Sequence, residues 1–272
     1  MPDSLLALEA VSRHYSNPGG QGRFAALQEV SFSLARGESL GIAGESGAGK
    51  STLGRLALGL EKPSSGRVLL KGTDLAGLNR RQQTAVKRQV QIIWQDPYIF
   101  LNPYYSVRKL LMEPMQVLGL AEGANLDDQV LALLELVDLP AHCLNSRPHE
   151  LSGGQCQRVA MARALAVEPE LLICDEALAS LDMPQQARIL NLLKKLQERT
   201  QISYLFISHD FTLLTKLCSR IAVLQKGLLV EIGNAADILA RPNHPYTRSL
   251  VQAASALPHR LAAPVPPNTT PG

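Results

Sequence analysis

The sequence contains a glycine-rich stretch whose residue types and spacing are typical of phosphate binding. Residues 44–52 read GESGAGKST, which fits the template of a glycine, four free positions and then Gly-Lys-Ser/Thr. In such a loop the backbone N–H groups point at phosphate oxygens, and we expect Lys50 to hold the β- and γ-phosphates and Ser51 to ligate Mg²⁺. The predicted nucleotide-binding residues are Gly44, Glu45, Ser46, Gly47, Ala48, Gly49, Lys50, Ser51 and Thr52. The alternative is a glycine-rich turn that merely begins a helix.

A pair of acidic residues follows a short apolar segment. Residues 171–174 (LLIC) are typical of a buried parallel strand, and Asp175 and Glu176 come directly after them. The carboxyl ends of such strands are where open α/β sheets bind ligands. We expect Asp175 to hold Mg²⁺ through water and Glu176 to polarise the attacking water as a general base. A solvated turn is the alternative interpretation.

Three further candidate side chains stand at the ends of predicted strands. Gln95 follows residues 90–94, and its amide can reach the metal site or the γ-phosphate. His209 follows residues 204–208, and its ring can hydrogen-bond the γ-phosphate. Tyr15 closes the first strand of the chain, where its ring can stack on adenine. Taken singly, each of these is more often an ordinary loop or strand residue.

A second glycine-containing segment precedes another predicted helix. Residues 151–155 read LSGGQ, and the helix is predicted over 156–167. A serine N-cap followed by two glycines leaves backbone N–H groups uncovered at a helix start, which makes a second potential phosphate site. Because one chain needs only one binding site for a γ-phosphate, we interpret this second site as binding a nucleotide that is held by another subunit. Its residues are Ser152, Gly153, Gly154 and Gln155. A simple capped helix is the alternative.

The elements that position these residues alternate between strands and helices. Apolar runs predict buried strands at 40–43, 90–94, 171–174 and 204–208, and helical periodicity predicts helices at 52–60, 79–88 and 183–199. Alternating patterns predict antiparallel strands at 5–11 and 25–34, and a hairpin at 221–232 that turns at Lys226-Gly227. The fold class is therefore α/β: a phosphate-loop NTPase core with a mostly parallel sheet and flanking helices, plus an N-terminal antiparallel β region.

The domain organisation follows from changes in this pattern. Helices predicted at 107–118 and 126–137 indicate a helical subdomain inserted at about residues 98–152 of a nucleotide-binding domain that spans 1–233. Helices at 235–240 and 246–256 form a C-terminal extension over 234–257. The proline-rich residues 258–272 have nothing to pack and are predicted to be a disordered tail.

Composition narrows the function classes. The 272 residues are 46% hydrophobic and 19% charged, with a net charge of +3, and they show no basic stretch of the kind that nucleic-acid binding requires. No secretory signal and no apolar run of about 20 residues is present, so we expect a chain on the cytoplasmic side whose membrane association comes through another protein. The four cysteines, without paired spacing, are expected to be reduced and buried.

Taken together and in this order, the phosphate loop, Gln95, LSGGQ, LLICDE and His209 resemble the nucleotide-binding subunits of ABC transporters, over residues 5 to about 233. The resemblance implies a head-to-tail dimer with two ATP molecules at its interface. Each ATP would be bound by the phosphate loop and Asp175 of one subunit and by the LSGGQ segment of the other. Glu176 would be the catalytic carboxylate, His209 the switch histidine and Tyr15 the adenine-stacking aromatic.

Two further stretches resemble the peptide and nickel importers within that family. The first stretch is residues 95–103, which contain QDPY at 95–98 and LNP at 101–103, and the second is NHPYT at 243–247. The ARALAVEP run and the LLKKLQ helix look closest to the second ATPase of nickel-import systems. Phe100 and Tyr104 depart from the small and basic residues expected in a loop that the family uses to contact its permease.

The importer resemblance implies a particular setting for the chain. Its partners would be a second, usually different ATPase subunit, two permease subunits and an extracytoplasmic binding protein, at the cytoplasmic face of the inner membrane. The cargo would be nickel, a nickel chelate, or di- or oligopeptides. The alternatives are a soluble ABC-type ATPase that remodels nucleic acid or ribosomes, and a phosphate-loop kinase or GTPase, which the LSGGQ segment argues against.

Overall fold

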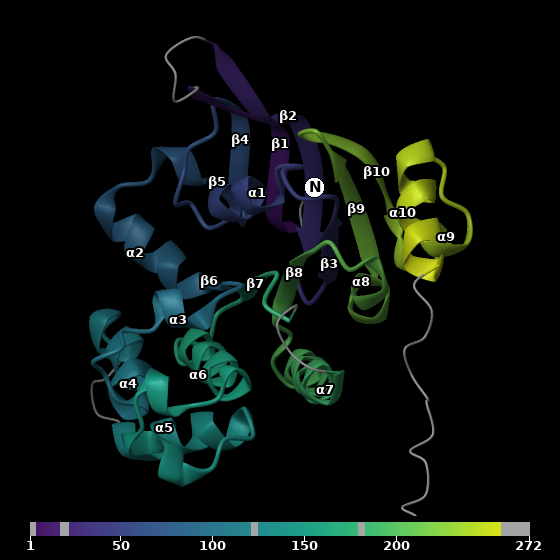
Figure 1. The fold of residues 1–272 in the computed structure, drawn as a ribbon. Coiled ribbons are helices and arrows are strands. Elements are labelled where there is room, and N and C mark those ends of the chain that lie inside the picture. Colours follow the sequence, from purple (N-terminus) through teal and green to yellow (C-terminus); the bar gives the residue numbers. More distant parts are fainter. Residues whose placement is uncertain (1–3, 17–21, 121–124, 179–182, 257–272) are drawn as a thin grey trace, which may run out of the picture.

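A computed structural model describes residues 4–16, 22–120, 125–178 and 183–256 (Figure 1). The predicted tail at 258–272 lies outside these residues. The central sheet has the strand order β10-β9-β3-β8-β7-β6. Its strands are β3 (Ser39–Ala43), β6 (Val90–Ile93), β7 (Leu171–Asp175), β8 (Ser203–Ser208), β9 (Arg220–Gln225) and β10 (Leu228–Asn234). All neighbouring pairs are parallel except the β9–β10 hairpin, which confirms the mostly parallel core.

The N-terminal β region is a separate antiparallel sheet. Its order is β2-β1-β4-β5, with β1 (Ser4–Ser16), β2 (Arg23–Ala35), β4 (Ser65–Leu70) and β5 (Thr73–Asp74). β1 and β2 are longer than the predicted 5–11 and 25–34, and they pair past Tyr15 and Phe24 as far as Ser16 with Arg23. The extra length carries Tyr15 to the end of the sheet.

Helices cover the central sheet and fill the inserted region. Those of the core are α1 (Lys50–Ala57), α2 (Arg80–Gln89), α6 (Gly153–Leu165), α7 (Met183–Thr200) and α8 (Phe211–Leu217), with the short η1 (Leu75–Gly77). The region predicted to be a helical subdomain holds α3 (Pro97–Phe100), α4 (Val107–Val117), α5 (Leu126–Leu136), η2 (Ala141–Asn145) and η3 (Pro148–Glu150). Figure 1 shows α4, α5 and α6 grouped below the sheet. The predicted C-terminal helices are α9 (Ala235–Ala240) and α10 (Pro245–Ala256).

The central sheet separates two apolar cores because successive side chains of a strand point to opposite faces. In β7, Leu171 and Ile173 pack with the antiparallel sheet and α1, whereas Leu172 and Cys174 pack on the side of the helical region. Strands buried on both faces read as continuous apolar runs, which is why 171–174 and 204–208 are recognisable from sequence. The cysteines at 143, 156, 174 and 218 are buried free thiols, as expected.

The helix after the phosphate loop is shorter at its carboxyl end than predicted. The apolar pattern predicts a helix over 52–60, but α1 begins at Lys50 and ends at Ala57. Gly59 adopts a φ of 70°, and the N–H of Leu60 donates to the carbonyl of Arg55. This Schellman motif, with its left-handed glycine, ends a helix even where apolar residues continue.

The helix after LSGGQ begins earlier than predicted. Ser152 is its N-cap, so Gly153 and Gly154 belong to the first turn of α6 rather than to a preceding loop. The Ser152 hydroxyl accepts from the N–H of Gln155 at 3.2 Å, and the Gln155 side chain accepts from the N–H of Ser152 at 2.9 Å. This capping box stabilises a helix start that glycine would otherwise weaken.

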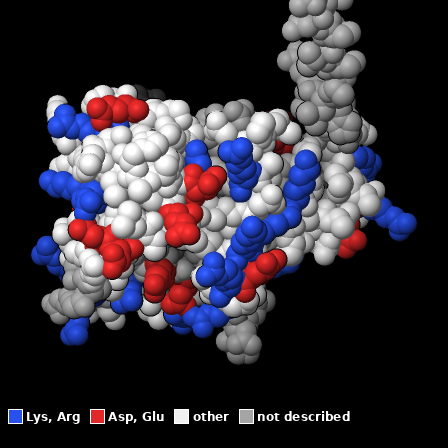
Figure 2. All heavy atoms as spheres, turned by 90° about the horizontal axis from the view of Figure 1, so that it is seen from below, with Lys and Arg blue, Asp and Glu red and all other residues white. Residues whose placement is uncertain are grey.

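The surface carries mixed charge. On the face seen in Figure 2, acidic and basic side chains lie next to one another rather than in separate fields. None of the helices among the described residues combines the length and apolarity that crossing a lipid bilayer requires.

Candidate nucleotide-binding site

The predicted site residues meet at one edge of the central sheet. Because β3, β8, β7 and β6 are parallel neighbours, the phosphate loop, His209, Glu176 and Gln95 all follow carboxyl ends on the same side. They surround a pocket of about 790 Å³. Its lining consists of Tyr15, Phe24, Ala26, Gly44, Glu45, Ser46, Gly47, Gly49, Lys50, Ser51, Thr52, Gln95, Glu176, His209 and Leu250. Ala48 instead packs into the core.

Two glycines of the loop are required by close backbone approaches. Gly44 has a φ of 153°, and a Cβ there would lie 2.4 Å from the carbonyl oxygen of Leu224. Gly49 has a φ of 103°, and a Cβ would lie 2.4 Å from the carbonyl oxygen of Ala26. Any side chain at these positions would push the loop off β9 and β2. The loop then delivers the N-terminus of α1, with its unpaired N–H groups, to the pocket.

Lys50 points into the pocket and is buried. Its ammonium donates to the carbonyl of Gly44 at 2.7 Å and to that of Glu45 at 2.9 Å, and it lies 4.0 Å from Oε1 of Glu176. Burial lowers the pKa of Lys50, while the carboxylates of Glu176 and Asp175 oppose that change. A buried ammonium of this kind gains most from a polyanionic ligand such as a triphosphate.

Ser51 lines the pocket, whereas Asp175 is not among the lining residues and adjoins the pocket through Ser51. The Ser51 hydroxyl donates to Oδ1 of Asp175 at 3.3 Å, and Asp175 is 6% exposed. Burial raises the pKa of Asp175 despite the hydrogen bond from Ser51. With the amide of Gln95, which lines the same pocket, they form an all-oxygen donor set that fits Mg²⁺.

Glu176 is held in an unusual backbone conformation. Its φ is 51°, in the left-handed region that glutamate rarely adopts, although its N–H still pairs with the carbonyl of Ile207. Such conformations cost about 1–3 kcal/mol and persist at functional sites where the surroundings enforce them. His209 Nδ1 lies 2.8 Å from Oε2 and 3.0 Å from Oε1 of Glu176. A carboxylate accepts hydrogen bonds, so the tautomer with the proton on Nδ1 is the one that can donate to Glu176.

Tyr15 lies at the far end of the pocket and is fixed by charged neighbours. Its hydroxyl donates to Oε2 of Glu61 at 2.5 Å, and the guanidinium of Arg13 lies 4.7 Å from its ring centroid. Phe24, its cross-strand partner, is 54% exposed and lines the same pocket. Phe24 is absent from the sequence prediction. Strand pairing is the signal that identifies it, because residues opposite one another across a hairpin share a face.

The LSGGQ segment does not line this pocket. Ser152 and Gly153 are exposed at the start of α6, and a Cβ on Gly153 would meet nothing within 4 Å. The side chain of Gln185 lies against Gly154, so the exposed part of this helix start consists of Ser152 and Gly153. The LSGGQ segment begins α6, which Figure 1 shows beside α4 and α5, whereas the phosphate loop follows β3 and leads into α1.

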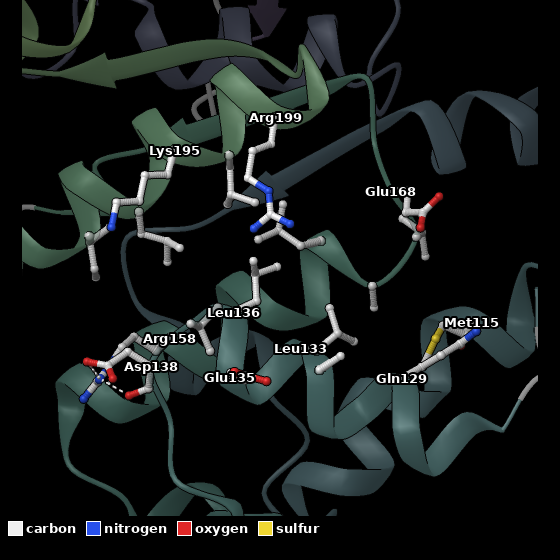
Figure 3. A pocket seen from close by; sticks show the side chains of 18 of the residues that line it. Met115, Gln129, Leu133, Glu135, Leu136, Asp138, Arg158, Glu168, Lys195 and Arg199 are labelled. Carbon is white, nitrogen blue, oxygen red and sulfur yellow. Dashed lines mark hydrogen bonds and ion pairs between the residues drawn. The ribbon is translucent and has the colours of Figure 1, made fainter.

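A separate groove lies between α5, α6 and α7 (Figure 3). Lys195 and Arg199 of α7 face Leu133 and Leu136 of α5 across it. Its volume is about 1010 Å³, more than that of the pocket at the phosphate loop. We do not assign the nucleotide to it, because the phosphate loop and the acidic strand end contribute nothing to its lining.

The strand order and the loop define a phosphate-loop NTPase fold, and comparisons with known proteins identify the family within it. A family model described as ABC transporter matches residues 27–179. A Brucella ovis chain named as a peptide import ATP-binding protein is 40% identical over 249 residues, which are 92% of this chain and 78% of that one. The nickel import ATP-binding protein NikE of Escherichia coli is 44% identical over 239 residues, which are 87% of this chain and 89% of that one.

Solved structures agree with the sequence matches. An ATP-binding cassette determined as a dimer in a post-hydrolysis state with ADP and phosphate has a TM-score of 0.77 at 28% identity, covering 85% of this chain and 98% of that one. The cbiO1 protein of Clostridium perfringens, part of the cbiONQ ABC transporter complex, has a TM-score of 0.75 at 28% identity. The match covers 88% of this chain and 92% of that one. The chain therefore belongs to the ABC transporter family, and it is an ATPase.

Proposed function

We propose that this chain is the ATP-hydrolysing subunit of a bacterial importer for nickel, nickel chelates, or di- or oligopeptides. It works at the cytoplasmic face of the inner membrane with two permease subunits, a second ATPase and an extracytoplasmic binding protein. The observation that carries the proposal is the pocket of about 790 Å³ lined by Lys50, Ser51 and Glu176, with Asp175 hydrogen-bonded to Ser51. The nickel and peptide import relatives support the cargo class.

Each pocket residue has a distinct role in the proposed reaction. Lys50 and the N–H groups at the start of α1 bind the phosphates of ATP. Ser51, Gln95 and Asp175 hold Mg²⁺, which when bound neutralises phosphate charge. Glu176 orients the attacking water and accepts its proton.

Two further side chains hold the reacting groups in place. His209 orients the carboxylate of Glu176 through the contacts at 2.8 and 3.0 Å and also reaches the γ-phosphate. Tyr15 stacks on adenine. Base stacking at one end of the pocket and phosphate binding at the other set the direction in which ATP lies.

The second half of the phosphate site comes from the other ATPase subunit. The open start of α6, with Ser152, Gly153, Gly154 and Gln155, contacts the γ-phosphate of the partner's ATP in a head-to-tail dimer. The resemblance to a cassette determined as a dimer with ADP and phosphate supports the pairing of two ATPase subunits. Closure of the dimer around ATP, and its opening after hydrolysis, drives the permease between its two orientations.

A photo-cross-linker at Ser152 tests this dimer. In the purified complex with ATP, we expect the probe to capture the phosphate loop of the other ATPase, identified by mass spectrometry of the linked peptide. The peptide also shows whether that subunit is a second copy or a different chain. A probe at Ser219, at the opposite edge of the central sheet beside Ser39, is the control that captures no phosphate loop. Capture of no phosphate loop from Ser152 would contradict the dimer.

An exposed aromatic surface supports contact with a permease. Tyr98, Ile99, Phe100 and Tyr104 all lie in the segment 98–104 that comes after Gln95, and Ile99 and Tyr104 are 72% and 82% exposed. Phe100 stacks on Trp94 with ring centroids 4.8 Å apart, which connects this surface to the strand that carries Gln95. We assign the permease contact to this surface because large exposed apolar groups mark interaction sites.

Purification of the chain with its neighbours tests the transport function. We expect it to co-purify with membrane permeases, and the complex in vesicles to take up either labelled nickel or a labelled dipeptide in the presence of ATP. The two labels are compared in parallel, with vesicles lacking ATP as the control. Recovery with ribosomes or DNA, and never with a permease, would favour the soluble alternative. The mixed charge in Figure 2 gives that alternative no support.

A further inference from the structure

The C-terminal helix α10 contacts the phosphate loop directly. The hydroxyl of Tyr246 accepts a hydrogen bond from the backbone N–H of Glu45 at 3.1 Å, across 201 residues of sequence. Leu250, four residues further along, lies on the same face of α10 and lines the nucleotide pocket. One face of α10 is therefore part of the wall of the site.

Glu45 links α10 to the lysine of the loop. Its N–H is bonded to Tyr246, and its carbonyl accepts from the ammonium of Lys50 at 2.9 Å. The adjacent carbonyl of Gly44 accepts from the same ammonium at 2.7 Å. Because one residue carries both contacts, a displacement of the Glu45 backbone moves an oxygen that holds Lys50.

The chain leading into α10 is anchored to β10. The carboxylate of Glu231 accepts from the N–H of Asn243 at 2.9 Å and from that of His244 at 3.0 Å. Partial burial is the largest single influence on Glu231 and opposes its ionised form, but the hydrogen bonds that it accepts together outweigh burial and lower its pKa. The N–H of Tyr246 donates to Nδ1 of His244 at 3.2 Å, which fixes the first turn of the helix.

Packing also holds α10 in place. It packs against α8, the helix that begins just after His209, and Tyr246 and Leu250 join the apolar core on that side of the sheet. Figure 1 shows α9 and α10 together beside β10 at the margin of the molecule. The helix that carries Tyr246 is thus held at its N-terminus by hydrogen bonds and along one face by packing against α8, and this places the Tyr246 hydroxyl next to the phosphate loop.

We propose that Tyr246 is a positioning residue for nucleotide binding. Through Glu45 it holds the phosphate loop and Lys50 in the conformation that receives the phosphates of ATP, so the C-terminal extension contributes to ATP affinity. The inference rests on the proposed role of the phosphate loop.

Replacing Tyr246 by Phe in the full chain tests the proposal. The change removes the hydroxyl and keeps the ring, so the loss is that of one hydrogen bond between neutral groups. We expect the Kd and the KM for MgATP to rise about three- to tenfold, with kcat and the nucleotide-free Tm unchanged, because Glu176 and the packing of α10 are untouched. Ser249→Ala is the matched control. Its exposed hydroxyl donates to the carbonyl of Tyr246 at 2.8 Å within the same helix, so ATP binding is expected to stay at the parental level.

Lys50→Ala, measured in parallel, separates failure of this inference from failure of the site assignment. If Lys50→Ala weakens ATP binding about 100-fold and Tyr246→Phe binds ATP as the parent does, the positioning role is wrong and the phosphate-loop assignment stands. A fall in nucleotide-free Tm together with kcat would show that Tyr246 acts on folding instead, which also overturns the proposal. Parental ATP binding by Lys50→Ala would overturn both.

Discussion

The Glu176→Gln variant is expected to bind ATP as the parent does and to hydrolyse it about 10²- to 10⁴-fold more slowly. Gln keeps the size of the side chain and can still accept the hydrogen bond from His209, but it cannot accept the proton of the attacking water. Because hydrolysis opens the proposed dimer, the ATP-bound dimer should accumulate. Phosphate release by the intact complex, ATP affinity and the dimer fraction measure the three effects.

Glu170→Gln provides the control for this variant. Glu170 precedes the other end of the same strand and pairs with Arg36 and Lys71 at the surface, so its loss should leave hydrolysis at the parental rate. Parental turnover by Glu176→Gln in the intact complex would refute the assignment of Glu176 as general base.

The Lys50→Ala variant is expected to lose about 100-fold in affinity for MgATP. A hydrogen bond to a charged group is worth about 1.5–3 kcal/mol, and a loss near 3 kcal/mol is about two powers of ten in Kd. In the nucleotide-free protein, burial lowers the pKa of Lys50 and so disfavours its charged form, whereas its hydrogen bonds to the carbonyls of Gly44 and Glu45 favour it, and the melting temperature reports the balance. Titration with a fluorescent ATP analogue and a nucleotide-free melting curve measure the two effects.

Lys87→Ala is the matched control for the loss of a positive charge, because Lys87 is exposed on α2, outside the pocket lining. Its ATP affinity should equal that of the parent. If Lys50→Ala binds ATP as tightly as Lys87→Ala, the phosphate loop does not bind ATP through this lysine.

Much of the fold could be predicted because its signals are local. The strands β3, β7 and β8 are buried on both faces and read as apolar runs, and their ends carry the residues predicted to meet at the site. The parallel order then places Gln95, Glu176 and His209 at one edge. The predicted helix boundaries were less accurate. The left-handed Gly59 ends α1 at Ala57 rather than at residue 60, and the capping box at Ser152 begins α6 at Gly153 rather than at residue 156. In both places backbone geometry prevails over the apolar pattern.

By itself the sequence determined the chemistry of this protein: a phosphate-binding loop, an acidic strand end and a second glycine-containing helix start, each encoded in a few adjacent residues. Only the tertiary structure decided which distant residues complete the site. Phe24 enters through strand pairing with Tyr15, and Tyr246 reaches Glu45 across 201 residues of sequence. The physical reason is that a motif carries its own backbone geometry, whereas contacts between distant segments depend on how the sheets and α10 pack, which no local pattern records.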